Sequence, residues 1–267
     1  MDTREVSTEM SRPAPQKVFD ADSLHVEIFG TRQTMGQAAG LDVAARVREI
    51  IAANGRAVVV FAAAPSQNEF LATLREQPGI DWSKVVAFHL DEYVGISQDA
   101  PQSFRNYLRR NLFGIVKPGI VHLIQGDAPD SQAESDRYSR LLKETPPDIA
   151  CIGIGENGHI AFNDPPVADF ADPATMKVVE LEERCRRQQV NDGCFATLGE
   201  VPKYAFTMTV PAVMSATYLY TMVPAKSKAQ AVRDTLKGPI TTNCPASILR
   251  QHPRAVLYLD VDSASLL

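Results

Sequence analysis

The sequence predicts an α/β fold, because segments with a helical period alternate with short apolar runs typical of buried strands. Two of these runs, Val85 to His89 and Asp148 to Ile154, lead directly into acidic or glycine-rich segments. In open α/β sheets, ligands bind beyond the carboxyl ends of parallel strands. We therefore predict a Rossmann-like, mostly parallel sheet with helices on both faces and a ligand site at one edge.

The elements are placed by hydrophobic period and by the turn residues between them. The predicted helices are Thr31 to Ala53, Ser66 to Glu76, Pro101 to Phe113, Ser131 to Glu144 and Lys226 to Lys237. The predicted strands are Arg56 to Ala62, Val85 to His89, Ile120 to Leu123, Asp148 to Ile154, Ala205 to Val210, Thr217 to Val223 and Ala255 to Leu259. This βαβ order implies that most strands are parallel.

Length and composition suit one domain of enzyme size. The chain has 267 residues, of which 45% are hydrophobic, enough for a substantial core. We assign residues 18–267 to a single domain and the polar, proline-containing residues 1–17 to a tail that is partly disordered.

Charge and hydropathy exclude several classes of partner. With 27 basic and 32 acidic residues the net charge is −5, so no overall positive field attracts nucleic acid or anionic membranes. No apolar run approaches the roughly 18 residues that span a bilayer, and the start lacks the apolar core of a signal peptide. We therefore expect a cytoplasmic protein.

The cysteines give no sign of a metal site or a disulfide framework, because they form no CxxC pair. They are Cys151, Cys185, Cys194 and Cys244.

The segment from Asp148 to Pro166 is the most informative part of the chain. A strand-like run ends in the glycine-rich turn GIGENG, and His159 and Asp164 follow it. Glycines let a backbone pass close to a ligand or adopt positive φ. Because His159 and Asp164 are five positions apart, they can meet only if the segment turns back on itself.

Other interpretations of this segment stay open. Gly153, Gly155 and Gly158 match the GxGxxG spacing of dinucleotide sites. However, no clear acidic partner for a ribose follows about 20 residues later, and no helical pattern begins directly after the last glycine. His159 could also be a structural histidine at a strand end.

A second buried strand is followed by the adjacent acids Asp91 and Glu92. Acids at the carboxyl end of a parallel strand lie where such sheets bind ligands. The alternative is that Asp91 caps the next turn and Glu92 faces solvent.

Four segments together resemble the glucosamine-6-phosphate deaminase (isomerase) family, whose wider group includes the 6-phosphogluconolactonases. They are LDEYVG (90–95), SFRNYLRRNLF (103–113), GIGENGHIAFNDP (153–165) and VPKYAFTMTV (201–210). The matches fall in one order from about residue 35 to the end. An acid after GHIAFN resembles the deaminase branch, whereas the lactonases typically continue into a Thr/Ser-rich stretch.

The resemblance implies an enzyme that converts glucosamine 6-phosphate and water to fructose 6-phosphate and ammonia, with no metal and no organic cofactor. In that reaction His159 opens the sugar ring, Asp91 removes the proton at carbon 2, and Asp164 orients His159 or relays its proton. Relatives often have Asp at the position of Asn157 and Glu at that of Asp164. Asn157 can hydrogen-bond His159 but cannot stabilise an imidazolium by charge.

Phosphate binding is where the sequence departs most from the resembled family. Ala63, Ala64 and Pro65 stand where a Thr-Gly-Gly-Thr-Pro-like loop usually holds the phosphate, and Pro65 has no amide hydrogen to donate. Ser66 supplies a hydroxyl there and is also an ordinary helix N-cap.

The resemblance implies two cations at the phosphate. The lysine is Lys228, and Lys226 is a plausible substitute. The plainer alternative is that Lys228 is a solvated helix residue. The arginine comes from a lid over the sugar phosphate at about residues 165–187, a connection with no sustained period. The predicted arginine is Arg186, and Arg184 and Arg187 compete for the same role.

Three other functions stay open. The enzyme could act on another amino-sugar or ketose phosphate, it could be a lactonase that uses His159 as the base for water, or it could be a sugar-phosphate-binding regulator without turnover. In each case the expected partner is a small-molecule sugar phosphate, with neither nucleic acid nor membrane. A homo-oligomer is left open.

Overall fold

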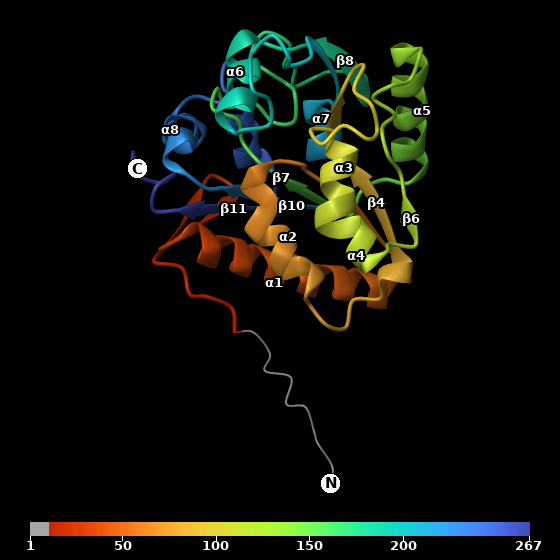
Figure 1. Ribbon diagram of the computed structural model, residues 1–267. Helices are drawn as coiled ribbons and strands as arrows, with labels where there is room; N and C mark the ends of the chain where they lie inside the picture. Colours follow the sequence, from red (N-terminus) through yellow and green to blue (C-terminus); the bar gives the residue numbers. More distant parts are fainter. Residues whose placement is uncertain (1–10) are drawn as a thin grey trace.

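The computed structural model describes residues 11–267, and its centre is an eight-stranded sheet (Figure 1). The strand order is β1-β2-β11-β10-β7-β3-β4-β6, and every neighbouring pair is parallel except β1 and β2. The strands are β1 (Lys17–Ala21), β2 (Leu24–Phe29), β3 (Ala57–Phe61), β4 (Val85–His89), β6 (Ile120–Val121), β7 (Ile149–Ile152), β10 (Tyr218–Val223) and β11 (Ala255–Asp260). The predicted α/β class with a mostly parallel sheet is confirmed.

Helices cover both faces of this sheet (Figure 1). The α-helices are α1 (Arg32–Asn54), α2 (Asn68–Arg75), α3 (Phe104–Leu108), α4 (Gly114–Val116), α5 (Ser131–Glu144), α6 (Glu183–Asn191), α7 (Val210–Met214) and α8 (Ala229–Lys237). Strand side chains alternate between two cores: Val59 and Phe61 pack with α1, α2 and α3, whereas Val58 and Val60 pack with α5 and α8. Burial on both faces explains why these strands are continuously apolar.

Local capping fixes the ends of the longest helix. Thr31 and Thr34 form a reciprocal capping box at the start of α1, and Gly55 ends it with a left-handed φ of 76°. Three of the other predicted helices contain a 3₁₀ or a π-helical turn. The turns Pro65–Gln67 and Lys226–Lys228 are 3₁₀ and precede α2 and α8, and the π-turn Arg109–Phe113 separates α3 from α4.

A second, three-stranded antiparallel sheet was not expected. Its order is β5 (Asp91–Tyr93), β9 (Tyr204–Met208) and β8 (Met176–Glu180). The prediction of a strand at Ala205 to Val210 was correct in type, but its place among the parallel strands was wrong. Periodicity marks an extended segment and carries no information about its pairing partner.

The regions predicted as tail and lid contain more structure than their sequences indicated. Residues 11–16 have no regular secondary structure, yet Arg12 forms ion pairs with Glu27 and Asp42, and β1 begins at Lys17. Residues 1–10 of the predicted tail lie outside the described residues. The expected lid contains β8 and the first half of α6.

Within residues 11–267, no helix combines the length and the apolar character that crossing a membrane requires.

The contact between α1 and α2 leads to a test of the fold. A Cβ atom on Gly36 would lie 2.4 Å from Cβ of Glu69 and 2.9 Å from its carbonyl carbon. Alanine normally stabilises a helix interior by about 1 kcal/mol relative to glycine, but overpacking costs about 1–3 kcal/mol. We expect Gly36→Ala to lower the free energy of unfolding, measured by urea titration.

The matched control is the exposed Ala52→Gly in the same helix, which should lose only about 0.5–1 kcal/mol through helix propensity. A Gly36→Ala protein more stable than the parent would contradict the close contact.

Candidate functional site

A cavity lies at the carboxyl edge of four neighbouring strands, β10, β7, β3 and β4. Successive connections leave β3 and β7 in opposite directions along the sheet, so the cavity lies at a topological switch point, where open α/β sheets bind ligands. Its wall includes residues after each strand: 62–67 after β3, 90–91 after β4, 153–155 and 159 after β7, and 224–225 and 227–228 after β10.

The position of Asp91 is fixed by the passage of the chain from one sheet to the other. The Leu90 amide donates to the carbonyl of Phe61 at 3.2 Å, and its carbonyl accepts from the amide of Met208 at 2.9 Å. Asp91 then begins β5 opposite Thr207. The backbone that carries Asp91 is therefore held by both sheets.

Burial makes the Asp91 carboxyl group a stronger base than a free aspartate. The loss of solvation raises its pKa well above the usual value, and the charge of the adjacent Glu92 raises it further. Both effects disfavour the ionised form. Once ionised, such a carboxylate has a greater tendency to take up a proton.

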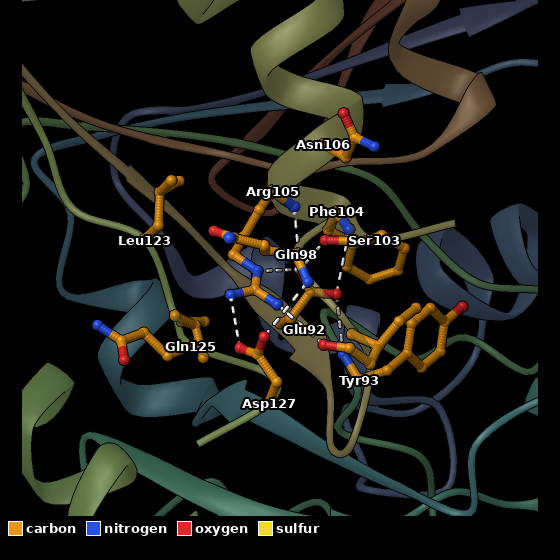
Figure 2. A network of polar contacts seen from close by, with 12 residues as sticks. Glu92, Tyr93, Gln98, Ser103, Phe104, Arg105, Asn106, Leu123, Gln125 and Asp127 are labelled. Atoms are coloured by element: carbon orange, nitrogen blue, oxygen red, sulfur yellow. Dashed lines mark hydrogen bonds and ion pairs between the residues drawn. The ribbon is translucent and has the colours of Figure 1, made fainter. Parts of the chain in front are cut away.

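Glu92 is fully buried, and its side chain caps the N-terminus of α3 although the residue belongs to β5, as Figure 2 shows. Its carboxylate accepts hydrogen bonds from the Ser103 hydroxyl at 2.8 Å and from the amides of Phe104 and Arg105 at 3.1 and 2.9 Å. These amides belong to the first turn of α3. The interpretation in which Asp91 caps a turn and Glu92 faces solvent is therefore wrong.

Arg105 extends this network toward the surface (Figure 2). Its Nε lies 3.4 Å from Glu92, and its other two nitrogens donate to Asp127 at 3.0 Å and to the carbonyl of Ile96 at 2.9 Å. The network fixes the start of α3, and Phe104 of that turn lines the cavity.

His159 and Asp164 meet because the chain turns back between them, as their spacing predicted. Nδ1 of His159 lies 2.9 Å from Oδ1 of Asp164, although the buried Nδ1 makes no hydrogen bond of standard geometry. The turn contains Ala161 with a φ of 51°. It is held by Asn163, whose side-chain amide donates to the carbonyls of Ile160 and Met208.

Asn157 organises this turn differently from the expectation. It was expected to bond the imidazole, but its side-chain oxygen accepts from the backbone amide of His159 at 3.1 Å. Its amide group donates to Asp164 at 2.9 Å and to Glu182 at 2.7 Å. Burial raises the pKa of Asp164, but contacts with His159, Asn157 and the Glu182 amide outweigh it and lower the pKa overall. Asp164 is therefore held as an anion beside His159.

The glycines of the GIGENG turn leave room for the His159 ring and allow a left-handed φ, and they do not begin a helix. A Cβ atom on Gly155 would lie 2.1 Å from Cε1 of the His159 ring, and Gly158 has a φ of 84°. The residues after Gly158 form turns and an isolated bridge. The local geometry thus lacks the helix N-terminus on which a dinucleotide pyrophosphate would rest.

Four residues predicted for the phosphate line the cavity, namely Ala63, Ala64, Ser66 and Lys228. Burial lowers the pKa of Lys228, while the negative charges of Asp192 and Glu156 oppose that effect. A dianionic phosphate beside Lys228 would favour its charged form further.

The structure does not bring the predicted arginine to the cavity. Arg186 donates to the carbonyls of Leu198 and Val201 at 2.7 and 2.9 Å, so its guanidinium holds the loop after α6. Arg184 donates to the carbonyl of Glu156, and Arg187 pairs with Glu183. Counting residues back from VPKY selected Arg186 but could not show which way its side chain points.

Sequence reasoning missed Arg32 in the cavity wall. Its Nε lies 2.8 Å from Glu69, and it also bonds the carbonyl of Pro65. It therefore holds the turn that follows β3. An arginine at the second position of the predicted helix Thr31 to Ala53 was the available signal.

Sequence reasoning also missed Gln188, Gln189 and Asp192, which line the cavity from α6 and its C-terminal cap. The Tyr93 hydroxyl donates to Oε1 of Gln189 at 2.7 Å, which leaves the amide nitrogen of Gln189 available to a ligand. Oε1 of Gln188 accepts from the Glu156 amide at 2.8 Å. The part of α6 that follows the expected lid thus contributes polar amides to the cavity.

Comparison with known proteins identifies the family. The model of the glucosamine-6-phosphate isomerases/6-phosphogluconolactonases matches residues 30–258. Glucosamine-6-phosphate deaminases of Lactobacillus delbrueckii subsp. bulgaricus and Listeria innocua are each 38% identical over 188 residues, covering 70% of this chain and 78% of each relative. The chain belongs to this family.

Solved structures agree in fold. A protein described as a monomeric glucosamine-6-phosphate deaminase has a TM-score of 0.84 and 31% identity, and the match covers 91% of this chain and 99% of that one. A 6-phosphogluconolactonase from Shewanella baltica has a TM-score of 0.72 at 17% identity, over 88% of this chain and 96% of its own. The second likeness bears on the fold alone.

The environment of Asp91 predicts a pH-dependent gain in stability on its replacement. The folded-state pKa of the carboxyl group is raised, so the folded protein holds the proton more tightly and stability falls as pH rises through that interval. Asparagine does not titrate. We expect Asp91→Asn to raise the thermal midpoint relative to the parent, increasingly so as the pH rises above about 4.

The exposed Asp99→Asn is the control and should show no such trend. A difference between Asp91→Asn and the parent that stays constant or shrinks with rising pH would contradict the raised pKa.

Proposed function

We propose that this protein converts glucosamine 6-phosphate and water to fructose 6-phosphate and ammonia. The observation that carries the proposal is the presence, in one cavity, of a buried carboxylate with a raised pKa and a histidine backed by an anion. The reaction needs a base for a carbon-bound proton and a group that exchanges protons with oxygen near neutral pH. The deaminases named above support the substrate assignment.

His159 is proposed to open the sugar ring. Asp164 faces Nδ1, which favours the tautomer that carries its proton on Nδ1 and leaves Nε2 as the proton acceptor. In this role Nε2 takes the proton of the carbon-1 hydroxyl and delivers it to the ring oxygen as the bond between carbon 1 and that oxygen breaks. Asp164 acts through His159 as a positioning residue.

Asp91 is proposed to move the proton that isomerises the open chain. Its carboxylate takes the proton from carbon 2 and returns it to carbon 1, while a second proton passes from the carbon-2 nitrogen to the carbon-1 oxygen, which converts the amino aldehyde to a ketimine. Water then adds to carbon 2 and ammonia leaves, giving the ketose. Because the pKa of Asp91 is raised, turnover should fall on acidification at a higher pH than for an ordinary aspartate.

The phosphate is proposed to lie against Ser66, Lys228 and Arg32, beside the turn formed by Ala63 and Ala64. This end of the cavity contains a buried lysine and an arginine, and charge-assisted hydrogen bonds are roughly twice as strong as neutral ones. The cations compensate for donors that the alanine and proline residues cannot supply.

The remaining parts of the proposal concern organisation and setting. Residues 18–267 act as one catalytic domain, in which α6 and the segment before it cover the sugar. A cytoplasmic enzyme is proposed. Monomer and homo-oligomer are to be distinguished by light scattering, and the solved relative described as monomeric favours the monomer.

The direct test is ammonia release from glucosamine 6-phosphate. We expect the parent to form ammonia and fructose 6-phosphate in equal amounts, and Asp91→Asn to lose about 10²- to 10⁴-fold in turnover because the base is replaced by an amide of similar shape. Exchange of the carbon-2 proton with deuterated water should be lost with it.

Each rival function has its own result in this assay. Hydrolysis of 6-phosphogluconolactone without ammonia release would identify a lactonase, and tight binding without product would identify a regulator. Exchange at carbon 2 at the parent rate in Asp91→Asn would remove Asp91 from its role.

The phosphate assignment predicts an effect that depends on the ligand. In the inactive Asp91→Asn background, we expect Lys228→Ala to weaken binding of glucosamine 6-phosphate about 10- to 100-fold, as for loss of a charged hydrogen bond. Binding of glucosamine should hardly change. Calorimetric titration gives both values.

Lys226→Ala is the matched control, because Lys226 is exposed two positions earlier and does not line the cavity. Equal losses for both lysines, or none for Lys228→Ala, would show that the phosphate lies elsewhere.

A further inference from the structure

Three buried side chains with metal-binding atoms meet behind the cavity wall. A ring nitrogen of His159, a carboxylate oxygen of Asp164 and Sγ of Cys185 all lie within 4.8 Å of one another. Their exposed fractions are 7%, 1% and 1%. The proposed reaction uses the first two residues, whereas Cys185 has no part in it.

We propose that His159, Asp164 and Cys185 bind a divalent cation of the Zn²⁺ class, and that this ion inhibits the enzyme. Imidazole, carboxylate and thiolate are the ligands that zinc takes in proteins, with bond lengths of about 2.0–2.3 Å. From separations within 4.8 Å, the three atoms need to close on a common centre by less than about 1 Å. Mg²⁺ and Ca²⁺, which prefer all-oxygen sites, do not fit this set.

The state of His159 favours a ligand at this point. Its Nδ1 is buried and makes no hydrogen bond of standard geometry, even though Asp164 lies 2.9 Å away. Buried polar atoms in native proteins usually have a hydrogen-bond partner. An ion bound by both side chains would use Nδ1 and the carboxylate together.

A second hollow adjoins one of the proposed ligands. Asp164 lines it together with Glu180 and Glu182, and three carboxyl groups around one hollow concentrate cations. Glu182 is the residue before the first turn of α6, and Cys185 lies in that turn.

Binding changes the protonation of two ligands in a defined way. The Cys185 thiol loses its proton to solvent as sulfur bonds the metal, and the proton on Nδ1 of His159 moves to Nε2 as the metal takes its place. One proton is released for each ion bound. Nε2 then has no lone pair with which to accept a proton, so ring opening stops while the cavity remains open.

The first experiment measures binding without reference to turnover. Co²⁺ is titrated into the whole protein and its absorption followed. We expect one ion per chain, with a sulfur-to-cobalt charge-transfer band and release of one proton. Cys185→Ala should lose the band and bind at least 10- to 100-fold more weakly, a loss no smaller than that from removing an outer partner of a metal ligand.

The control is Cys194→Ala, a partly buried cysteine outside the cluster, which should match the parent. Cys185→Ser repeats the test with a side chain of closer size in case the alanine variant is unstable. A parent spectrum without the sulfur band, or equal affinity in the parent and either Cys185 variant, would overturn the site.

The second experiment tests inhibition and rests on the proposed function. Zn²⁺ should stop ammonia release by the parent and by Cys194→Ala, and a chelator should restore it. Cys185→Ala should keep its turnover and lose most of its sensitivity to Zn²⁺. Undiminished turnover of the parent with the site filled would overturn the inhibitory role, whereas absence of ammonia release without metal would count against the proposed function and leave the Co²⁺ result standing.

Discussion

The backbone of Leu90 joins the two sheets of the molecule, and the candidate site depends on that junction. Its amide bonds to Phe61 in the parallel sheet and its carbonyl bonds to Met208 in the antiparallel sheet. Because side chains alternate along a strand, the next residues point in opposite directions. Asp91 faces the cavity, and Glu92 points to the start of α3. Tyr93 returns to the side of Asp91 and contacts Gln189.

Two adjacent buried carboxyl groups have different surroundings at this junction, and so they take different roles. Burial raises the pKa of Glu92, but four hydrogen bonds, from Ser103, Phe104, Arg105 and the Tyr93 amide, oppose that shift and stabilise its charged form. Asp91 faces the cavity, and burial and the charge of Glu92 both favour its protonated form. Neighbouring carboxyl groups whose environments differ in this way are a common arrangement for acid-base chemistry. The same contacts that anchor α3 therefore tune the proposed base.

The cations of the cavity are balanced by nearby acids. Arg32 lies beside Glu69, and Lys228 lies within the field of Asp192 and Glu156. A phosphate entering the cavity would compete with these carboxylates for the same cations, which limits its affinity and favours its release. The loop after β3 contributes few side-chain hydrogen-bond donors, because three alanines and a proline precede Ser66. In the proposed site, cations from separate elements, at the starts of α1 and α8, take over that task.

The sequence determined the α/β class, most of the strands and the pair Asp91 and His159, because these depend on local period and on residues that directly follow buried strands. It also showed that His159 and Asp164 could meet only if the chain turned back between them. Only the tertiary structure decided that Ala205 to Val210 joins a second sheet and that Arg186 points away from the cavity. It also decided that Arg32 and Gln189 enter the cavity and that Cys185 lies beside His159. These facts depend on contacts between segments distant in sequence and on side-chain direction, neither of which a local pattern encodes.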